Sequence, residues 1–367
     1  MFDDGLLPAE AWVAALLQLD SMGPAKMRVV LAGRTPAEAW AAIVSDEPLK
    51  TSATLRQRWR VKARSTDVKA LWQQHTSHGI SVLLTESVGF PARLIGDPEP
   101  PDVLFVRGDL GVLRLPTVAI IGTRNCTQYG ADVAYEFGRD LAATGICVLS
   151  GLALGIDAAA HAGALAANLA PPVAVVGSGL DRIYPSRNRA LWASVAQAGA
   201  VVSEYPLGSA PLRWHFPARN RILAGLADVV VVVESGEEGG SMHTVAEAAA
   251  RDRTVMAVPG PIRSPASAGT NHLLADGCAP ATSAGDIVAM LGLCPISEAI
   301  RPTPITVADK SHQRILDSFC WQSVDLNTLV KRTGMDFSAL SIGLESLRQT
   351  RQIVQRGQWF ERTTGRL

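Results

Sequence analysis

The chain lacks any excess of one sign of charge. Its 367 residues contain 34 Lys and Arg against 34 Asp and Glu, so the formal net charge is zero. This balance excludes a uniformly basic nucleic-acid coat and an acidic tail, because any polyanion must be held by a local cluster of charge. With 47% hydrophobic and 19% charged residues, the chain can bury a large core, and global disorder is disfavoured. Its length predicts roughly two to three domains of about 150 residues.

Cysteine is scarce and long apolar runs are missing. The five cysteines are Cys126, Cys147, Cys278, Cys294 and Cys320. They form no CxxC pair and no Cys/His metal spacing, so we expect reduced thiols and no metal site. The acidic start, Met1-Phe2-Asp3-Asp4, is unlike a signal peptide, and no apolar run approaches the roughly 18 residues that cross a bilayer. We therefore expect a cytoplasmic protein with no membrane contact.

Common catalytic motifs are also missing. There is no GxxxxGK[ST], which excludes a P-loop ATPase, and no complete GxGxxG with an acid about 20 residues further on, which disfavours ordinary dinucleotide binding. HExxH and GxSxG do not occur either, and no nucleophile–base pair is evident. These absences disfavour the enzyme and cofactor classes that the motifs mark, and we expect no bound cofactor.

Residues 1–75 are expected to form an N-terminal helical domain. Apolar residues recur at helical spacing over 9–19, Met22-Gly23-Pro24 interrupts them, and further helices are predicted over 25–32 and 36–43. Two short helices around a glycine turn are typical of a helix-hairpin-helix, whose backbone N–H groups can meet a phosphate. An ordinary helical pair that packs its Leu face is the favoured interpretation. For the basic segment 56–64, a solvated helix face is the favoured interpretation.

Residues 76–294 alternate short β-branched runs with Ala-rich helical stretches. Strands are predicted over 117–121, 146–149, 173–176, 200–203, 228–233 and 255–258, with 81–84 and 103–106 as further candidates. Helices are predicted over 131–143, 158–167, 188–198 and 242–251. The continuous Val run at 229–233 indicates a strand buried on both faces. The alternation predicts an α/β fold with a doubly wound, mostly parallel sheet.

A Pro-rich stretch over 295–310 is expected to be a linker to a separate domain at 311–367. Three helical stretches are followed there by strands at 353–355 and 359–361 around Gly357, which is typical of a winged helix. Nine Lys and Arg against six Asp and Glu between 305 and 367 make this region only mildly basic. Binding of duplex DNA and docking of a protein are both consistent with that composition.

Four loops rich in Gly, Ser, Thr and Arg follow strands of the predicted sheet. In a doubly wound fold, ligands bind beyond the carboxyl ends of the strands, where glycine admits an anion and arginine matches phosphate oxygens. Four such loops in one sheet indicate a site more strongly than a single glycine loop does. The candidate binding residues of the loops are Gly122, Thr123, Arg124, Ser150, Gly151, Gly155, Gly177, Gly240 and Ser241.

Asp157 and His161 lie one turn apart on the helix predicted after the second loop. One interpretation is that both side chains form a polar pair lining the pocket. The favoured interpretation is structural, with Asp157 capping the helix and His161 packed inside.

An arginine- and aromatic-rich stretch separates the third loop from the fourth. Six arginines and only one acid, Glu204, occur between 182 and 221, which concentrates positive charge. Arginine neutralises phosphates and aromatic rings stack on unpaired bases, so the pattern indicates single-stranded nucleic acid. The alternative is salt bridging by the arginines, with Trp214 and Phe216 in the core. The arginines are Arg182, Arg187, Arg189, Arg213, Arg219 and Arg221.

The loops carry a family resemblance. Together with flanking residues they are similar to the motifs of the DNA-processing protein A family (DprA, also called Smf), and they occur in the family's order. The matching stretches are Val118–Arg124, Ser150–Ala153, Gly155–His161, Gly177–Asp181, Tyr184-Pro185, Ser203–Pro206, His215–Ile222, Pro259-Gly260, Ser264-Pro265 and Gly269–Asn271. The flanks also resemble the family's optional parts, an N-terminal sterile-alpha-motif or helix-hairpin-helix domain and a C-terminal winged helix.

The resemblance implies a binding protein that is not an enzyme and that has an extended Rossmann fold. Family members bind single-stranded DNA, form dimers, protect incoming strands in natural transformation and help load the RecA recombinase. Carried over by motif, the loop after 117–121 would hold a phosphate and the second loop would line the same pocket. The positive groove would continue through Arg187, Arg189, Arg219, Asn220 and Arg221.

Two positions depart from the family pattern. The family often has Lys after the Tyr-Pro element, where this chain has Ser186, and Arg187 or Arg189 would then supply the charge. A basic residue usually precedes the fourth loop, but Glu237 and Glu238 stand here. We expect this acidic pair to weaken phosphate binding at that loop.

Two other function classes compete with strand binding. The stretch from Gly239 to Glu247 loosely resembles a loop of Rossmann-type hydrolases of nucleoside monophosphates, with Glu247 as the acid/base residue, although Glu238 stands where that motif normally has Pro. A regulator that reads duplex DNA through the C-terminal domain is the third class. The mild charge excess of that domain counts against it.

Overall fold

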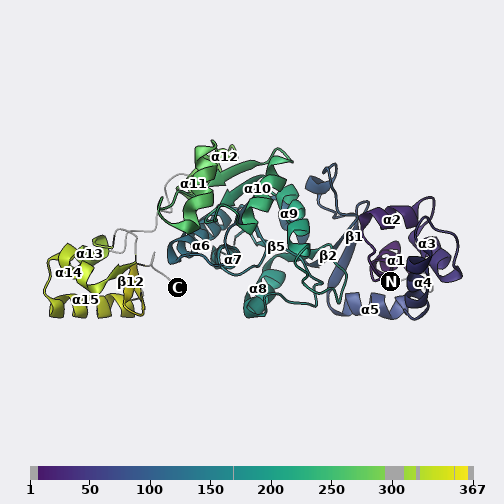
Figure 1. The fold of residues 1–367 in the computed structure, drawn as a ribbon, viewed down its shortest axis with the longest axis horizontal. Helices are drawn as coiled ribbons and strands as arrows, with labels where there is room; N and C mark the ends of the chain where they lie inside the picture. The colour runs from purple at the N-terminus through teal and green to yellow at the C-terminus, as the bar shows by residue number, and fades with distance from the viewer. Residues whose placement is uncertain (1–6, 168, 294–309, 320–322, 351, 363–367) are drawn as a thin grey trace.

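The computed structural model describes residues 7–167, 169–293, 310–319, 323–350 and 352–362. The N-terminal helices, a central sheet with helices on both faces, and a small C-terminal unit follow one another along the long axis of the molecule (Figure 1). The expected linker at 295–310 falls almost wholly outside the described residues, as do Cys294 and Cys320. Within the described part of the chain, no helix combines the length and apolar character needed to cross a bilayer.

Five helices make up the described part of the N-terminal region, from residue 7 on, and their bounds are α1 Ala9–Leu16, α2 Pro24–Leu31, α3 Pro36–Ser45, α4 Ala53–Arg64 and α5 Val68–Ser77. Local sequence explains several starts: Thr35 and Glu38 form a capping box on α3, and the Ser52 and Asp67 side chains cap α4 and α5. The basic segment lies on α4 as a partly solvated face, where Arg60 pairs with Asp46 at 2.6 Å.

The central sheet has nine strands in the order β1-β2-β6-β5-β4-β3-β7-β8-β9. Strands β3 to β9 are parallel, and β1 and β2 add an antiparallel edge beside β6. The fold is therefore an α/β Rossmann-like fold with a mostly parallel sheet, as predicted. The bounds are β1 Ile80–Leu84, β2 Val103–Gly108, β3 Thr117–Ile121, β4 Cys147–Ser150, β5 Val173–Val176, β6 Ala200–Ser203, β7 Val229–Val232, β8 Thr254–Ala257 and β9 Ala279–Pro280.

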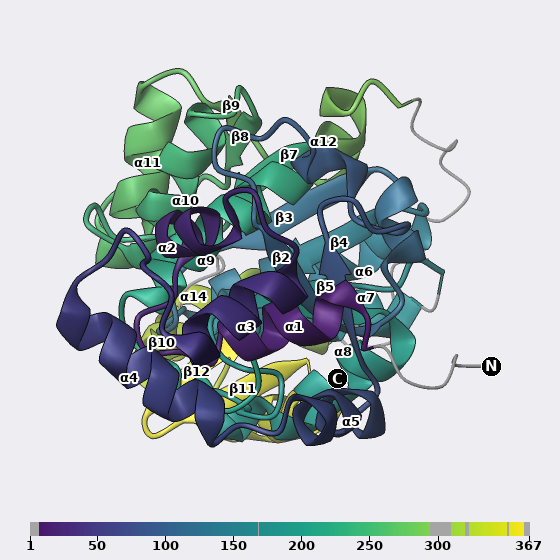
Figure 2. The same cartoon turned by 90° about the vertical axis from the view of Figure 1, so that its right-hand side faces the viewer.

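Alternate residues of the central strands enter different cores. In β3, Val118 and Ile120 pack with α6, α7 and α12, while Ala119 and Ile121 pack with α9, α10 and α11. The two helical layers are visible on either side of the sheet in Figure 2. The bounds are α6 Gln128–Ala143, α7 Ile156–Ala167, α8 Arg189–Ala198, α9 His215–Leu226, α10 Gly240–Ala249, α11 Ala268–Ala275 and α12 Ala284–Met290.

A separate hydrophobic core holds the C-terminal unit together, around Ile315, Phe319, Leu329 and Leu344. Three helices precede a strand pair, and a short strand, β10, joins the pair to give the order β10-β12-β11. The bounds are α13 Lys310–Asp317, β10 Val324–Asp325, α14 Leu326–Thr333, α15 Phe337–Gln349, β11 Ile353–Arg356 and β12 Trp359–Arg362.

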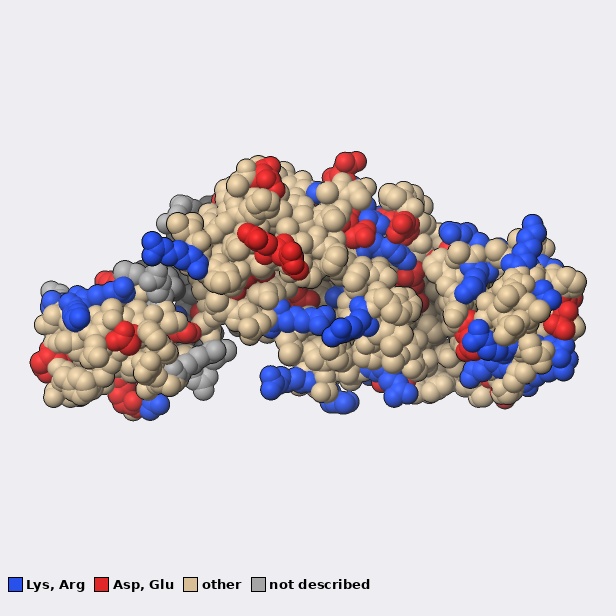
Figure 3. Space-filling view, in the orientation of Figure 1, with Lys and Arg blue, Asp and Glu red and all other residues tan. Residues whose placement is uncertain are grey.

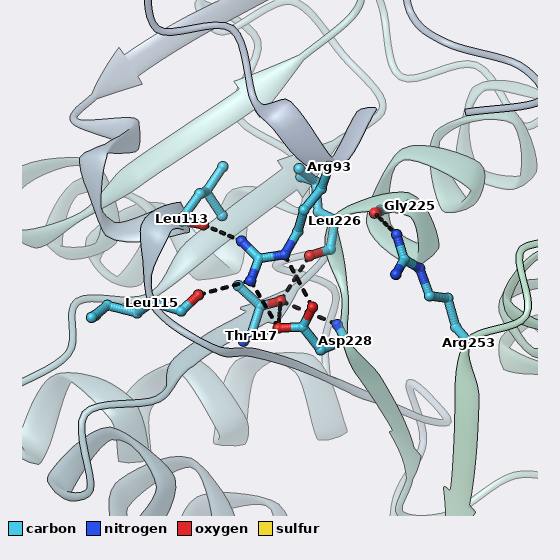
Figure 4. Close-up of polar contacts among 8 residues, drawn as sticks. All are labelled: Arg93, Leu113, Leu115, Thr117, Gly225, Leu226, Asp228 and Arg253. Carbon is cyan, nitrogen blue, oxygen red and sulfur yellow. Dashed lines mark hydrogen bonds and ion pairs between the residues drawn. The ribbon is translucent and has the colours of Figure 1, made fainter. Parts of the chain in front are cut away.

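A half-buried polar network fastens the segment between β1 and β3 to the central sheet (Figure 4). The Arg93 guanidinium donates to both carboxylate oxygens of Asp228, at 3.1 and 2.9 Å, and to the carbonyls of Leu113 and Leu115. Thr117 donates to the same carboxylate from its backbone N–H at 2.8 Å. Burial alone would raise the pKa of Asp228, but the hydrogen bonds from Arg93 and Thr117 outweigh it and lower that pKa.

Replacing Asp228 by asparagine is expected to destabilise the fold by about 2 kcal/mol at pH 7, because charged hydrogen bonds to a half-buried carboxylate are lost. A lowered folded-state pKa means that the contribution is present above the unfolded-state pKa of about 4 and fades as pH falls through the folded value. Urea unfolding at pH 7 and below about pH 4 should show the difference in stability from the parent protein becoming smaller in acid. Asp276→Asn, at an exposed carboxylate, should have little effect at either pH.

Candidate functional site

A hollow of about 660 Å³ opens at the carboxyl ends of the parallel strands. It lies where the strand order reverses, with β3 and β7 as neighbours and the sheet continuing outward from each. Doubly wound folds bind ligands at such a point. Its walls come from the loop after β3, the start of α9 and the first turn of α10. The predicted site residues that line it are Gly122, Thr123, Arg124, Arg219, Asn220, Gly240 and Ser241.

The loop after β3 is held in place so that one arginine projects from it. Thr123 donates its backbone N–H to the carbonyl of Glu234 at 2.7 Å. A Cβ on Gly122 would lie 2.6 Å from the Ile156 side chain, so only glycine fits this turn. Arg124 is exposed, and its guanidinium stacks over the Phe216 ring at 5.1 Å from the centroid. The arrangement orients a planar cation over the hollow while leaving its donors free for a ligand.

The N-terminus of α6 behind this loop is already occupied by a carboxylate. Glu234, which is 1% exposed, accepts from the Thr127 backbone N–H at 2.8 Å and from the Thr127 hydroxyl at 2.6 Å. This carboxylate offsets the helix dipole and takes the donors that a phosphate would need. Anion binding at the loop after β3 therefore depends on the Arg124 side chain and not on the helix end.

Beneath the hollow lies a buried pair of opposite charges, Asp157 and Arg219. Asp157 accepts from the backbone N–H groups of Gly151 and Ala153 at 3.1 and 3.4 Å. Burial raises the pKa of Asp157, and the Arg219 charge opposes the rise. Burial likewise lowers the pKa of Arg219, and Asp157 opposes that shift. Each charge thus partly offsets the effect of burial on the pKa of the other.

Gly151 has a spatial reason to be glycine. A Cβ at this position would lie 2.1 Å from the Arg219 guanidinium. Ser150, beside it, is fully buried and donates its hydroxyl to the Ile120 carbonyl at 2.7 Å. Gly155 has φ +77° and packs against the Thr123 carbonyl. The second loop therefore shapes the floor of the hollow, and in this structure these three residues support the site without lining it.

His161 is fully buried on α7. Burial, together with the nearby Arg219 charge, lowers its pKa to about 3, so the imidazole is neutral at neutral pH. Asp157 does line the hollow, but His161 does not. The structure thus supports the packed histidine, but Asp157 accepts from the second loop and lines the hollow instead of capping the helix.

Aromatic side chains border the hollow on the α9 side. Tyr184 and Phe216 both line it, with ring centroids 5.6 Å apart. Trp214 is 63% exposed and packs edge-on against His215 at 4.0 Å, so the alternative of a core position does not hold for it. Exposed rings beside arginines provide faces on which unpaired bases can stack.

Four further predicted residues lie outside the hollow. Gly177 accepts at its carbonyl from His215 Nδ1 at 3.0 Å. Arg187 and Arg189 are exposed at the start of α8. Arg221 is neutralised: one guanidinium nitrogen meets both carboxylate oxygens of Glu204 at 2.6 Å. Arg221 therefore does not supply a free charge to the groove, because a largely buried carboxylate already holds it.

Residues that were not among the candidates complete the lining. Arg213 and Phe216 belong to the arginine–aromatic stretch, and that pattern was the available signal for them. His243 and Thr244 come from the first turn of α10, which only the folded helix brings to the hollow. Among the described residues, no group of three or more His, Cys, Asp or Glu side chains is arranged to hold a metal ion.

Glu247 does not have the surroundings of a catalytic acid/base. Its carboxylate pairs with Arg251 at 2.5 Å, and Arg251 is held in turn by Asp97. The residue lies on α10 but does not line the hollow. The interpretation as a nucleotide hydrolase therefore has no support in this geometry.

Comparison with known proteins identifies the family. Residues 81–292 match the family model described as DNA recombination-mediator protein A. The chain belongs to this family. The family is one of recombination mediators and not of enzymes, in agreement with the prediction from sequence. The matched segment contains strands β2 to β9, all of β1 except its first residue, and every residue that lines the hollow.

Individual relatives agree with this assignment. Protein Smf of Escherichia coli is 37% identical over 243 residues, which cover 65% of this chain and 64% of that protein. The DNA processing protein DprA of Streptococcus pneumoniae is 41% identical over 191 residues, 52% of this chain and 67% of the relative. The matches thus span about two thirds of these relatives.

Two solved structures, with 30% and 32% sequence identity to this chain, resemble this one. The X-ray structure of pneumococcal DprA gives a TM-score of 0.63 at 30% identity, covering 76% of this chain and 97% of that one. DNA processing protein A of Helicobacter pylori, described for its single-stranded DNA binding mode, gives 0.53 at 32% identity, covering 58% and 95%. Both similarities support the Rossmann-like fold of the central region.

Proposed function

We propose that this protein binds single-stranded DNA in the hollow and acts as a recombination mediator without catalysing a reaction. The observation that carries the proposal is the Arg124 guanidinium stacked on Phe216 above a hollow that Arg213 and Arg219 also line. A strand needs phosphate partners and stacking faces close together. This hollow supplies both, in a chain whose net charge is zero.

We assign roles to the residues as follows. Arg124 and Arg213 contact phosphates, and Arg219 adds charge from the floor. Tyr184 and Phe216 offer ring faces to bases. Arg187 and Arg189 extend the path along α8, where basic side chains gather below the hollow in Figure 3. Gly122, Thr123, Asn220, Gly240 and Ser241 form the surface against which the strand lies.

Titration of single- and double-stranded oligonucleotides at about 0.05 and 0.2 M salt tests the proposal. We expect tighter binding of single strands, little dependence on base sequence, and affinity that falls steeply with salt because counterions are released from the DNA. Affinity that does not change with salt would refute phosphate recognition. Release of free base from nucleoside monophosphates would show that the protein is an enzyme, which would refute that part of the proposal.

The proposal also includes the partners that the family resemblance implies, a second copy of the chain and RecA recombinase. We propose that the protein forms a homodimer, protects incoming strands during natural transformation and helps load RecA recombinase onto them. The support is family membership and the likeness to DprA proteins. Light scattering of the full chain tests dimerisation. RecA assembly on covered single strands, with and without the protein, tests loading.

The flanking regions are proposed to be separate modules at 1–75 and 311–367, around a DNA-binding domain at 76–294. For the first we propose a sterile-alpha-motif or helix-hairpin-helix type, supported by its short helices around glycine turns. For the second we propose a winged helix, supported by three helices followed by the β11–β12 pair. Phe337 and Ile342 of α15 are 61% and 71% exposed, which favours protein docking over duplex reading.

A further inference from the structure

The hollow is electrically asymmetric. Its three arginines, at 124, 213 and 219, come from the loop after β3 and the region of α9. The opposite wall, formed by α10, contributes Gly239, Gly240, Ser241, His243 and Thr244 and no Lys or Arg. Figure 3 shows basic side chains on the side of the hollow toward α8 and acidic side chains on the side toward α10.

Glu237 and Glu238 stand at the head of the α10 wall. Both are exposed, and they directly precede the two glycines that line the hollow. Neither forms an ion pair with another side chain in the described part of the chain. The N-terminus of α10 would otherwise attract a phosphate through its dipole. The two carboxylates offset that attraction, so this wall repels anions while the arginine wall binds them.

We propose that Glu237 and Glu238 make the site selective for single-stranded DNA by repelling a second phosphate backbone. This inference rests on the proposed function. One backbone can lie along the arginine wall with its bases toward Phe216. A duplex brings a second backbone across a groove of about 6 or 12 Å, and that backbone meets the glutamates.

The charge density of duplex DNA and the range of electrostatic repulsion are both consistent with this selection for single strands. Duplex DNA carries one negative charge per roughly 1.7 Å, twice the density of one of its strands. Exposed charges act over about 10 Å at 0.1 M ionic strength, which is the scale of a groove. A single strand can turn its phosphates away from the carboxylates because its backbone is flexible. A duplex cannot turn both backbones away at once.

The test compares single- and double-stranded affinity in the full chain carrying Glu237→Gln and Glu238→Gln. At about 0.05 M salt we expect duplex affinity to rise roughly tenfold and single-strand affinity by no more than about threefold. The matched control, Glu86→Gln with Asp252→Asn, removes two exposed negative charges outside the hollow. It should leave the ratio of the two affinities unchanged.

The outcomes separate this inference from the proposed function. An equal rise for both DNAs, or a control that changes the ratio as much, would show an effect of net charge only and would overturn the proposal. Unchanged affinities would overturn it as well. If the parent protein binds no single strands, the proposed function fails first. If the parent binds them and the ratio stays constant in the variant, only the role of Glu237 and Glu238 fails.

Discussion

Replacing Arg124 and Arg213 together by alanine is expected to weaken single-stranded DNA binding roughly a hundredfold at about 0.05 M salt. Both arginines line the hollow, and the exposed Arg124 guanidinium lies over the Phe216 ring. Their loss removes two phosphate contacts and a charged partner of the stacking face. All base sequences should be affected alike, because phosphate contacts carry no sequence information.

The salt dependence is the second measurement on this variant. Each lost phosphate contact should flatten the plot of log affinity against log salt concentration by about 0.7. Arg28→Ala with Arg114→Ala is the matched control, because both arginines are exposed and neither lines the hollow. A control that lost as much affinity would mean that binding follows overall charge, and the hollow would not be the site.

Gly163→Ala is expected to destabilise the protein by about 3 kcal/mol, since overpacking a rigid contact has a cost of that order. The α6 and α7 helices approach each other through glycines. A Cβ on Gly163 would lie 2.0 Å from the Tyr135 carbonyl oxygen, and one on Gly138 would lie 2.2 Å from that of Ala160. Backbone atoms cannot rotate aside as a side chain can, so the helices must separate.

Urea unfolding measures this effect, with Gly285→Ala in α12 as the control. There a Cβ would meet only the Ser283 hydroxyl, at 3.4 Å, and alanine gains about 1 kcal/mol of helix propensity over glycine. We expect the control to be neutral or slightly more stable. A Gly163→Ala protein as stable as its parent would show that α6 and α7 can separate without cost. Because α7 begins beneath the loop after β3, their separation should also disturb the hollow.

Strand positions were predictable because these strands are buried on both faces. Runs such as Val173–Val176 and Ala200–Ser203 contain little besides β-branched and small residues, and their observed bounds equal the predicted ones. Helix α9 was not predicted. Nearly every residue of it from Arg219 to Leu226 is buried, so no polar face alternates with an apolar one and the helical period is hidden.

The amino-acid sequence by itself determined the sheet, the glycine-rich loops at its strand ends and the family, because these depend on short runs of residues in a fixed order. Only the tertiary structure decided which arginines are free. Arg221 is neutralised by Glu204, Arg219 is buried under Gly151, and Arg124 remains exposed over Phe216. Those partners lie far apart along the chain or on different elements, and charge pairing depends on distances that only folding sets.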